Sequence, residues 1–131
     1  MARTNAQAVD KGGMSSSPRR VFHEVTIPEG ASESEPINVG GAAVVGVYVT
    51  SPDWPEANIA FAVSMDGETY YLACEQDGSP AIVEGAIAGR AYVAPIAPLL
   101  ASRFVKLIAL DEAAVALAMD VEVTLTVVIA P

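Results

Sequence analysis

The sequence Val-Glu-Val-Thr-Leu-Thr-Val-Val-Ile at residues 121–129 is the clearest guide to the fold class. Val121, Val123, Leu125, Val127 and Ile129 alternate with residues that are mostly polar. Successive side chains of a β-strand point to opposite faces, and β-branched side chains suit a pleated surface. The stretch therefore predicts a β-strand with one buried face.

Similar patterns upstream predict further strands. Residues 21–27 alternate with a period of two, and residues 44–49 form an apolar run in which Gly46 indicates a bulge or a close backbone approach. Asp66-Gly67 predicts a hairpin turn. Residues 111–118 suit either one or two helical turns or a loop. The other predicted strands cover residues 36–39, 59–63, 69–74, 81–84, 90–94 and 103–110.

With about eight strands and a turn signal every ~8–12 residues, we predict an all-β fold. The expected architecture is an antiparallel β-sandwich of the jelly-roll type, covering residues 19–131. Residues 1–18 lack apolar periodicity and contain Gly12-Gly13 and a Ser-rich run, which predicts a flexible arm. The arm is either idle or ordered against a neighbouring molecule.

Charge is divided along the same boundary. The net charge is −9, but residues 1–20 hold four bases and one acid, whereas residues 21–131 hold three bases and fifteen acids. An acidic body argues against nucleic acid and against an anionic membrane surface as main partners. We also expect no secretory signal and no membrane span. The bases of the arm, Arg3, Lys11, Arg19 and Arg20, are candidate partner-binding residues.

Few residues suited to catalysis are present. His23 is the single His and Cys74 the single Cys, and no nucleophile motif surrounds either residue. We expect His23 to be partly buried on the apolar face of its strand. The acidic pairs Asp66/Glu68 and Glu75/Asp77 lack the spacing of a calcium loop and are interpreted as turn residues. The sequence thus predicts no enzyme, cofactor or metal site.

Aromatic side chains supply the remaining candidate contacts. Trp54, between Pro52 and Pro55, is expected to close one end of the sandwich, although it is also a candidate partner-binding residue. Tyr70 and Tyr71 are adjacent and should point to opposite faces of a strand, and we select Tyr70 as a candidate contact. A carbohydrate site would draw on the aromatic set Tyr48, Trp54, Tyr70, Tyr71 and Tyr92.

Several motifs of turns and strands occur along the chain: Ile27-Pro28-x-Gly30, Val39-Gly40-Gly41, Val45-Gly46-Val47, Pro52-x-Trp54 and Ser64-x-Asp66-Gly67-x-Thr69-Tyr70, and later Arg103-Phe104-Val105-Lys106-Leu107. In these motifs the chain, chiefly over residues 27–72, resembles a group of small virion proteins of tailed phages and prophages. After Leu110 the chain departs from the group, which usually has a Gly/Ser-rich turn where this chain has Asp-Glu and Ala-rich sequence.

The resemblance implies a non-enzymatic virion structural protein. The first expectation is a capsid decoration or cement protein, made in the host cytoplasm, that binds the outer surface of the head and stabilises it. Its partners would be the major capsid protein or other virion proteins, and on the capsid it would form a homo-oligomer. The alternatives are a tail-associated or adaptor subunit and a carbohydrate-binding β-sandwich module.

Overall fold

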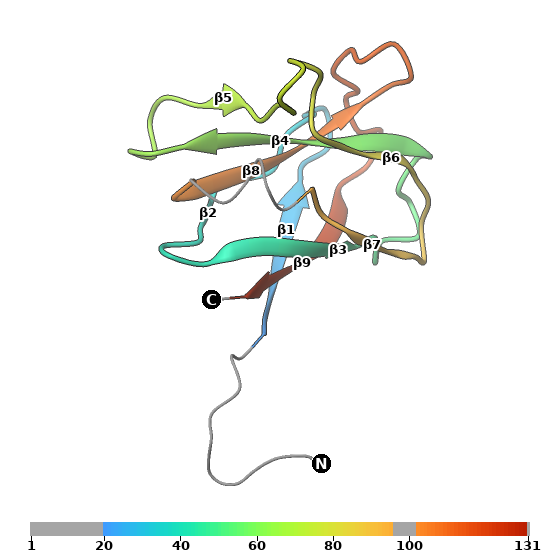
Figure 1. Ribbon diagram of the computed structural model, residues 1–131. Coiled ribbons are helices and arrows are strands. Elements are labelled where there is room, and N and C mark those ends of the chain that lie inside the picture. The colour runs from blue at the N-terminus through green and yellow to red at the C-terminus, as the bar shows by residue number, and fades with distance from the viewer. Residues whose placement is uncertain (1–19, 96–101, 131) are drawn as a thin grey trace, which may run out of the picture.

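The computed structural model describes residues 20–95 and 102–130, which form two antiparallel sheets packed face to face (Figure 1). No helix occurs in this part of the chain. The predicted arm, residues 1–18, lies outside the described residues. The strands are β1 (Val21–Ile27), β2 (Ile37–Asn38), β3 (Ala43–Tyr48), β4 (Ala57–Ser64), β5 (Tyr71–Leu72), β6 (Ile82–Ala86), β7 (Ala91–Val93), β8 (Phe104–Leu110) and β9 (Val123–Ala130).

The strand order is that of a jelly roll. One sheet has the order β1-β9-β3-β7, and the other has β2-β8-β4, with β5 and β6 both paired to β4. β6 pairs with residues 57–60 of β4 and β5 with residues 62–63, so these two short strands follow one another along one edge of β4. Without β5, eight strands alternate between the two sheets in the jelly-roll pattern. The predicted β-sandwich is confirmed.

The core between the sheets is mostly aliphatic. Phe61, Ile59 and Leu107 fill it from the five-stranded sheet, and Ile27 and Leu125 fill it from the four-stranded sheet. In β9, every second residue from Val123 to Ile129 is buried, as the alternation predicted. Burial of these side chains is the main favourable contribution to the stability of the sandwich.

β1 differs from its prediction in its first half. Val25 and Ile27 are buried, but Val21 is 53 % exposed and His23 is also exposed, so the expected burial of His23 is wrong. β1 is an edge strand, and its N-terminal end projects away from the second sheet (Figure 1). The alternation correctly assigned residues to faces, but it carried no information on how far the opposite sheet extends.

β3 contains the irregularity that Gly46 indicated. The register between β3 and β9 shifts between Val44 and Gly46, as in a β-bulge. A Cβ atom built on Gly46 would lie 3.3 Å from the carbonyl oxygen of Tyr92 and 3.7 Å from the Val128 side chain. Gly46 therefore allows three strands to approach closely.

Residues 111–118 follow the loop alternative and not the helical one, because Asp111 Oδ1 accepts hydrogen bonds from the N–H groups of Ala113 and Val115 and Ala114 has a φ of 62°. One predicted strand is less regular than its pattern suggested. The strand predicted over residues 69–74 shortens to Tyr71–Leu72. The Thr69 N–H donates to Asp66 instead of to a neighbouring strand.

We expect Gly46→Ala to destabilise the protein by about 1–3 kcal/mol, because the new methyl group must displace backbone or a packed Val. Gly41→Ala is the matched control, since Gly41 is exposed and a Cβ there meets no atom within 4 Å. The control should change stability by less than about 0.5 kcal/mol. Urea unfolding of both variants measures the difference, and equal midpoints would contradict the assigned role of Gly46.

Candidate functional site

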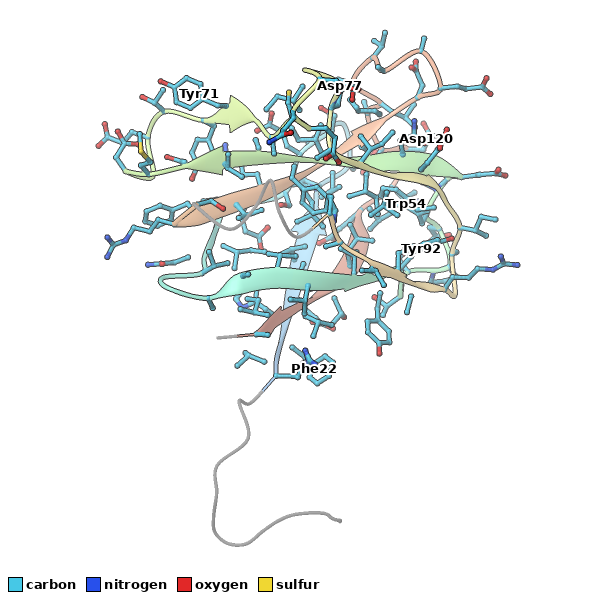
Figure 2. The ribbon with its side chains drawn as sticks, viewed as in Figure 1. Phe22, Trp54, Tyr71, Asp77, Tyr92 and Asp120 are labelled. Carbon is cyan, nitrogen blue, oxygen red and sulfur yellow. The ribbon has the colours of Figure 1, made fainter. Side chains whose placement is uncertain are left out.

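The predicted contact residues lie in different environments. Trp54 is only 5 % exposed, and its indole N–H donates a hydrogen bond of 3.0 Å to the Ala86 carbonyl oxygen. It lies between the two sheets (Figure 2), as expected for a residue that closes the sandwich, so its ring is not part of the accessible surface. Arg20 is exposed, while Arg3, Lys11 and Arg19 lie outside the described residues.

The two adjacent tyrosines do point to different surroundings, but the more exposed one is Tyr71. Tyr71 is 61 % exposed, on the outer side of the five-stranded sheet (Figure 2). Tyr70 is half-buried, and the Lys106 ammonium lies 4.4 Å from its ring centroid. Lys106 also pairs with Glu33 at 3.2 Å. Tyr71 is therefore the more accessible of the two rings, while the selection of Tyr70 as a partner-binding residue stays a prediction.

His23 and Cys74 belong to opposite halves of the sandwich. His23 lies in β1 of the four-stranded sheet, and Cys74 follows β5 of the five-stranded sheet. Both residues are exposed, and the Cys74 thiol donates a weak hydrogen bond of 3.5 Å to the Leu72 carbonyl oxygen. The structure does not bring them together as a nucleophile and its base.

The acidic pairs act as turn residues. Asp66 Oδ1 accepts hydrogen bonds from the N–H of Thr69 at 3.0 Å, the N–H of Glu68 at 2.9 Å and the Ser64 hydroxyl at 3.0 Å. These bonds, that from Thr69 foremost, hold the pKa of Asp66 below its ordinary value. The Ser79 hydroxyl at 2.6 Å and the Ser79 N–H lower the pKa of Asp77 in the same way. The carboxylates thus stabilise their own turns.

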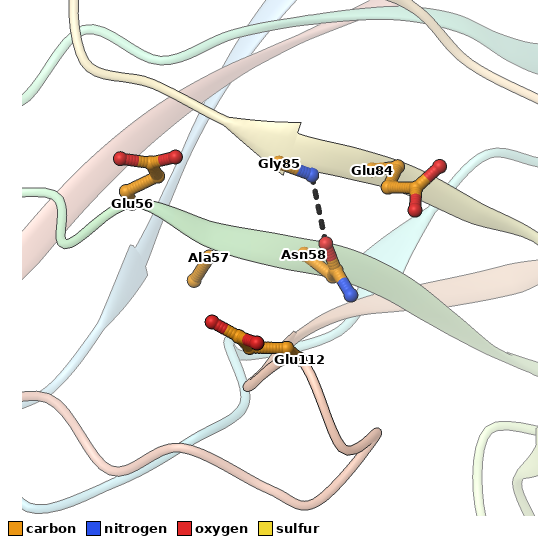
Figure 3. Close-up of a pocket in the computed structure, with 6 residues that line it drawn as sticks. All are labelled: Glu56, Ala57, Asn58, Glu84, Gly85 and Glu112. Atoms are coloured by element: carbon orange, nitrogen blue, oxygen red, sulfur yellow. Dashed lines mark hydrogen bonds between the residues drawn. The ribbon is translucent and has the colours of Figure 1, made fainter.

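An acidic hollow of about 420 Å³ opens between β4, β6 and the loop after β8 (Figure 3). Glu56, Glu84 and Glu112 line it, together with Asn58, whose Oδ1 accepts a 2.7 Å hydrogen bond from the Gly85 N–H. Across residues 20–95 and 102–130, no three His, Cys, Asp or Glu side chains form a group that could hold a metal ion.

The outer face of the four-stranded sheet carries a second hollow, of about 290 Å³. We call it the apolar groove. Gly46 and Val128, which are buried, line it together with Tyr48 and Val93, which are exposed. Of the lining residues only Arg20 carries a charge. Val93 is 79 % exposed and Tyr48 is 44 % exposed, so a partner can reach both.

An aromatic pair borders the apolar groove. Phe22 of β1 is 63 % exposed and lies on the outer side of the four-stranded sheet (Figure 2). Its ring meets that of Tyr48 edge-on, with the centroids 6.3 Å apart. Neither Phe22 nor Val93 was predicted from the sequence as a contact residue. The signal for Phe22 was present, because it occupies the outward register of an alternating strand, where a polar residue is usual.

Comparison with protein-family models, curated proteins and solved structures found no match for the chain. Within the described residues there is also no helix of the length and hydropathy needed to cross a membrane.

We expect Asp66→Asn to weaken the pH dependence of stability in acid. The folded-state pKa of Asp66 lies below its ordinary value of 3.8, so the unfolded chain binds the proton more readily. The stability from the carboxylate is therefore present above about pH 5 and is lost as the pH falls through the folded-state pKa. The stability difference between wild type and variant should shrink with decreasing pH.

Thermal melts at several pH values test this expectation. Asp120→Asn is the control, because it removes one negative charge at an exposed position outside these turns. A stability difference for Asp66→Asn that stays constant from neutral to acidic pH would show that its hydrogen bonds do not favour the carboxylate.

Proposed function

We propose that the chain is a non-enzymatic structural protein of a tailed-phage virion that decorates the outer surface of the head and stabilises it. The observation that carries the proposal is the exposed apolar groove at the end of the sheet where the basic segment joins the domain. The resemblance of residues 27–72 to small virion proteins supports the same role. Jelly rolls serve in capsids among many other functions, so the fold alone does not decide it.

The apolar groove has the properties of a docking surface. Phe22, Tyr48 and Val93 expose apolar side chains across three strands of one rigid sheet. Full burial of such a side chain contributes about 1.5–3 kcal/mol to binding, before the costs of association. The backbone of a β-sheet changes little on binding. Contact with a repeated capsid surface would therefore cost little conformational entropy.

The bases near the start of the chain would add an electrostatic contribution. Arg20 lines the apolar groove, and Arg3, Lys11 and Arg19 precede it in sequence. The described residues hold fifteen acids and four bases, so most of the surface would repel an acidic partner. The bases near the start of the chain would attract such a partner to the side of the apolar groove that Arg20 lines. We propose that this combination directs the apolar groove toward acidic, apolar sites on the major capsid protein or another virion protein.

A carbohydrate-binding module is the second candidate. The Phe22–Tyr48 pair beside a hollow offers aromatic surface on which a sugar ring can stack. A glycan array probed with the full chain distinguishes the two functions. Specific glycan binding that Tyr48→Ala abolishes would favour the module and contradict the structural role.

We expect Val93→Glu to weaken binding to assembled heads of the encoding phage or prophage by at least about tenfold, because it places a charge in the apolar contact. Val115→Glu is the matched control, since Val115 is 58 % exposed but lies in the loop after β8. Co-sedimentation with purified heads gives the affinity. Heads should also raise the melting temperature of the wild-type protein.

Two results would overturn the proposal. The first is a lack of binding to heads by the wild-type protein. The second is an equal loss for Val93→Glu and Val115→Glu, which would indicate a general charge effect. If tails or adaptor complexes bind and heads do not, the chain is a tail-associated or adaptor subunit.

A further inference from the structure

β1 presents a free edge. It pairs only with β9, and in the part of the chain that the structure describes no strand lies on its other side. At seven residues it is the longest edge strand of the sandwich. Its sequence, Val-Phe-His-Glu-Val-Thr-Ile, contains neither Pro nor Lys, the residues that commonly block strand addition.

Hydrogen bonds elsewhere in the sheet determine which residues of β1 face this edge. The Val49 N–H donates to Arg90 and the Ala94 N–H to Val45, so odd-numbered residues of β3 bond to the β7 side. Tyr48 therefore bonds to Thr126 of β9, which is opposite it.

The same alternation continues across β9. Because Thr126 bonds toward β3, its neighbours Leu125 and Val127 bond toward Val25 and His23 of β1. The backbone N–H and C=O groups of Phe22 and Glu24 then point away from β9, to the free edge.

The side chains along this edge form a self-complementary pattern. Arg20, Phe22 and Glu24 alternate with Val21 and His23, so a strand continued back to Arg20 presents all three on its outer face. All three are exposed. When two copies of this series lie antiparallel with their Phe22 residues opposite each other, Arg20 of each copy lies opposite Glu24 of the other. The pairing thus places a cation opposite an anion at both ends and two aromatic rings together in the middle.

We propose that two copies of the chain associate through β1, antiparallel and with Phe22 opposite the partner's Phe22. The two four-stranded sheets then form one continuous sheet across a two-fold axis. Arg20 of each copy faces the partner's Glu24, with Cβ atoms about 5 Å apart. The paired residues are those whose backbone groups point to the edge, so the register also forms the main-chain hydrogen bonds.

Other two-fold registers lack this complementarity. With the axis at Glu24, the two Glu24 carboxylates face each other, and like charges directly opposite are unfavourable. With the axis at His23, Phe22 faces the partner's Glu24, and Arg20 loses its anion. Charge complementarity therefore selects both the occupant, a second copy, and the register. The inference does not depend on the proposed virion role.

Charge reversal tests the contact in the full chain. We expect sedimentation equilibrium, from micromolar to millimolar protein, to show a monomer–dimer equilibrium. Arg20→Glu alone and Glu24→Arg alone should each weaken the dimer by about tenfold or more, because each places like charges together twice. The double variant Arg20→Glu, Glu24→Arg should recover the wild-type dissociation constant, since it restores both pairs.

Phe22→Pro provides a second test by removing the N–H that points to the edge. Proline is tolerated at such positions of an edge strand, so circular dichroism should remain that of a folded sandwich while the dimer is lost. Retention of the dimer would overturn the proposal.

Other outcomes also overturn it. One is a wild-type chain that stays monomeric at every protein concentration tested. Another is a dimer whose dissociation constant is unchanged by the charge reversals. A third is a chain that dimerises only after residues 1–18 are deleted, because those residues would then occupy the edge themselves.

Discussion

The pairing of β9 with both β1 and β3 is the interaction on which the rest of the sandwich depends. Among residues 20–95 and 102–130, β9 is the only strand bonded to β1, and it also supplies Val123, Leu125 and Val127, all buried, to the core. Val21 and Ile129 pair although they are distant in sequence, so this sheet requires non-local contacts. The same arrangement leaves the other edge of β1 and the outer face over Gly46 accessible. The apolar groove and the free edge of β1, to which we assign partners, thus both follow from the position of β9.

The alternation of apolar and polar residues made the strands predictable, and it failed where local side chains compete for the backbone. β9 and β8 follow their patterns closely. β5 is shorter than its pattern because Asp66 binds N–H groups at its start. The order of the strands could not be predicted, because it depends on contacts between residues that are distant in sequence and not on the pattern within any single segment.

The candidate sites were predicted less well than the fold, for a related reason. Trp54 was correctly expected to close the sandwich, since two nearby prolines fix its loop. Tyr70 and Tyr71 were assigned to opposite faces, but which one is accessible depends on Lys106, 35 residues or more away in sequence. The apolar groove combines residues from three strands, β3, β7 and β9, with Arg20, and Gly46, which has no side chain, lies among them. A pattern read along one strand does not reveal such a surface.

The environment of Trp54 has a practical consequence for spectroscopy. It is the only tryptophan in the chain, and its indole is buried with its N–H bonded to Ala86 of β6. Its fluorescence therefore comes from a single position that contacts the core, and unfolding moves that indole into water. The apolar groove and the β1 edge lie on the four-stranded sheet, whereas the hydrogen-bond partner of Trp54 belongs to the five-stranded sheet. The protein thus contains an intrinsic reporter of folding that does not form part of either proposed contact surface.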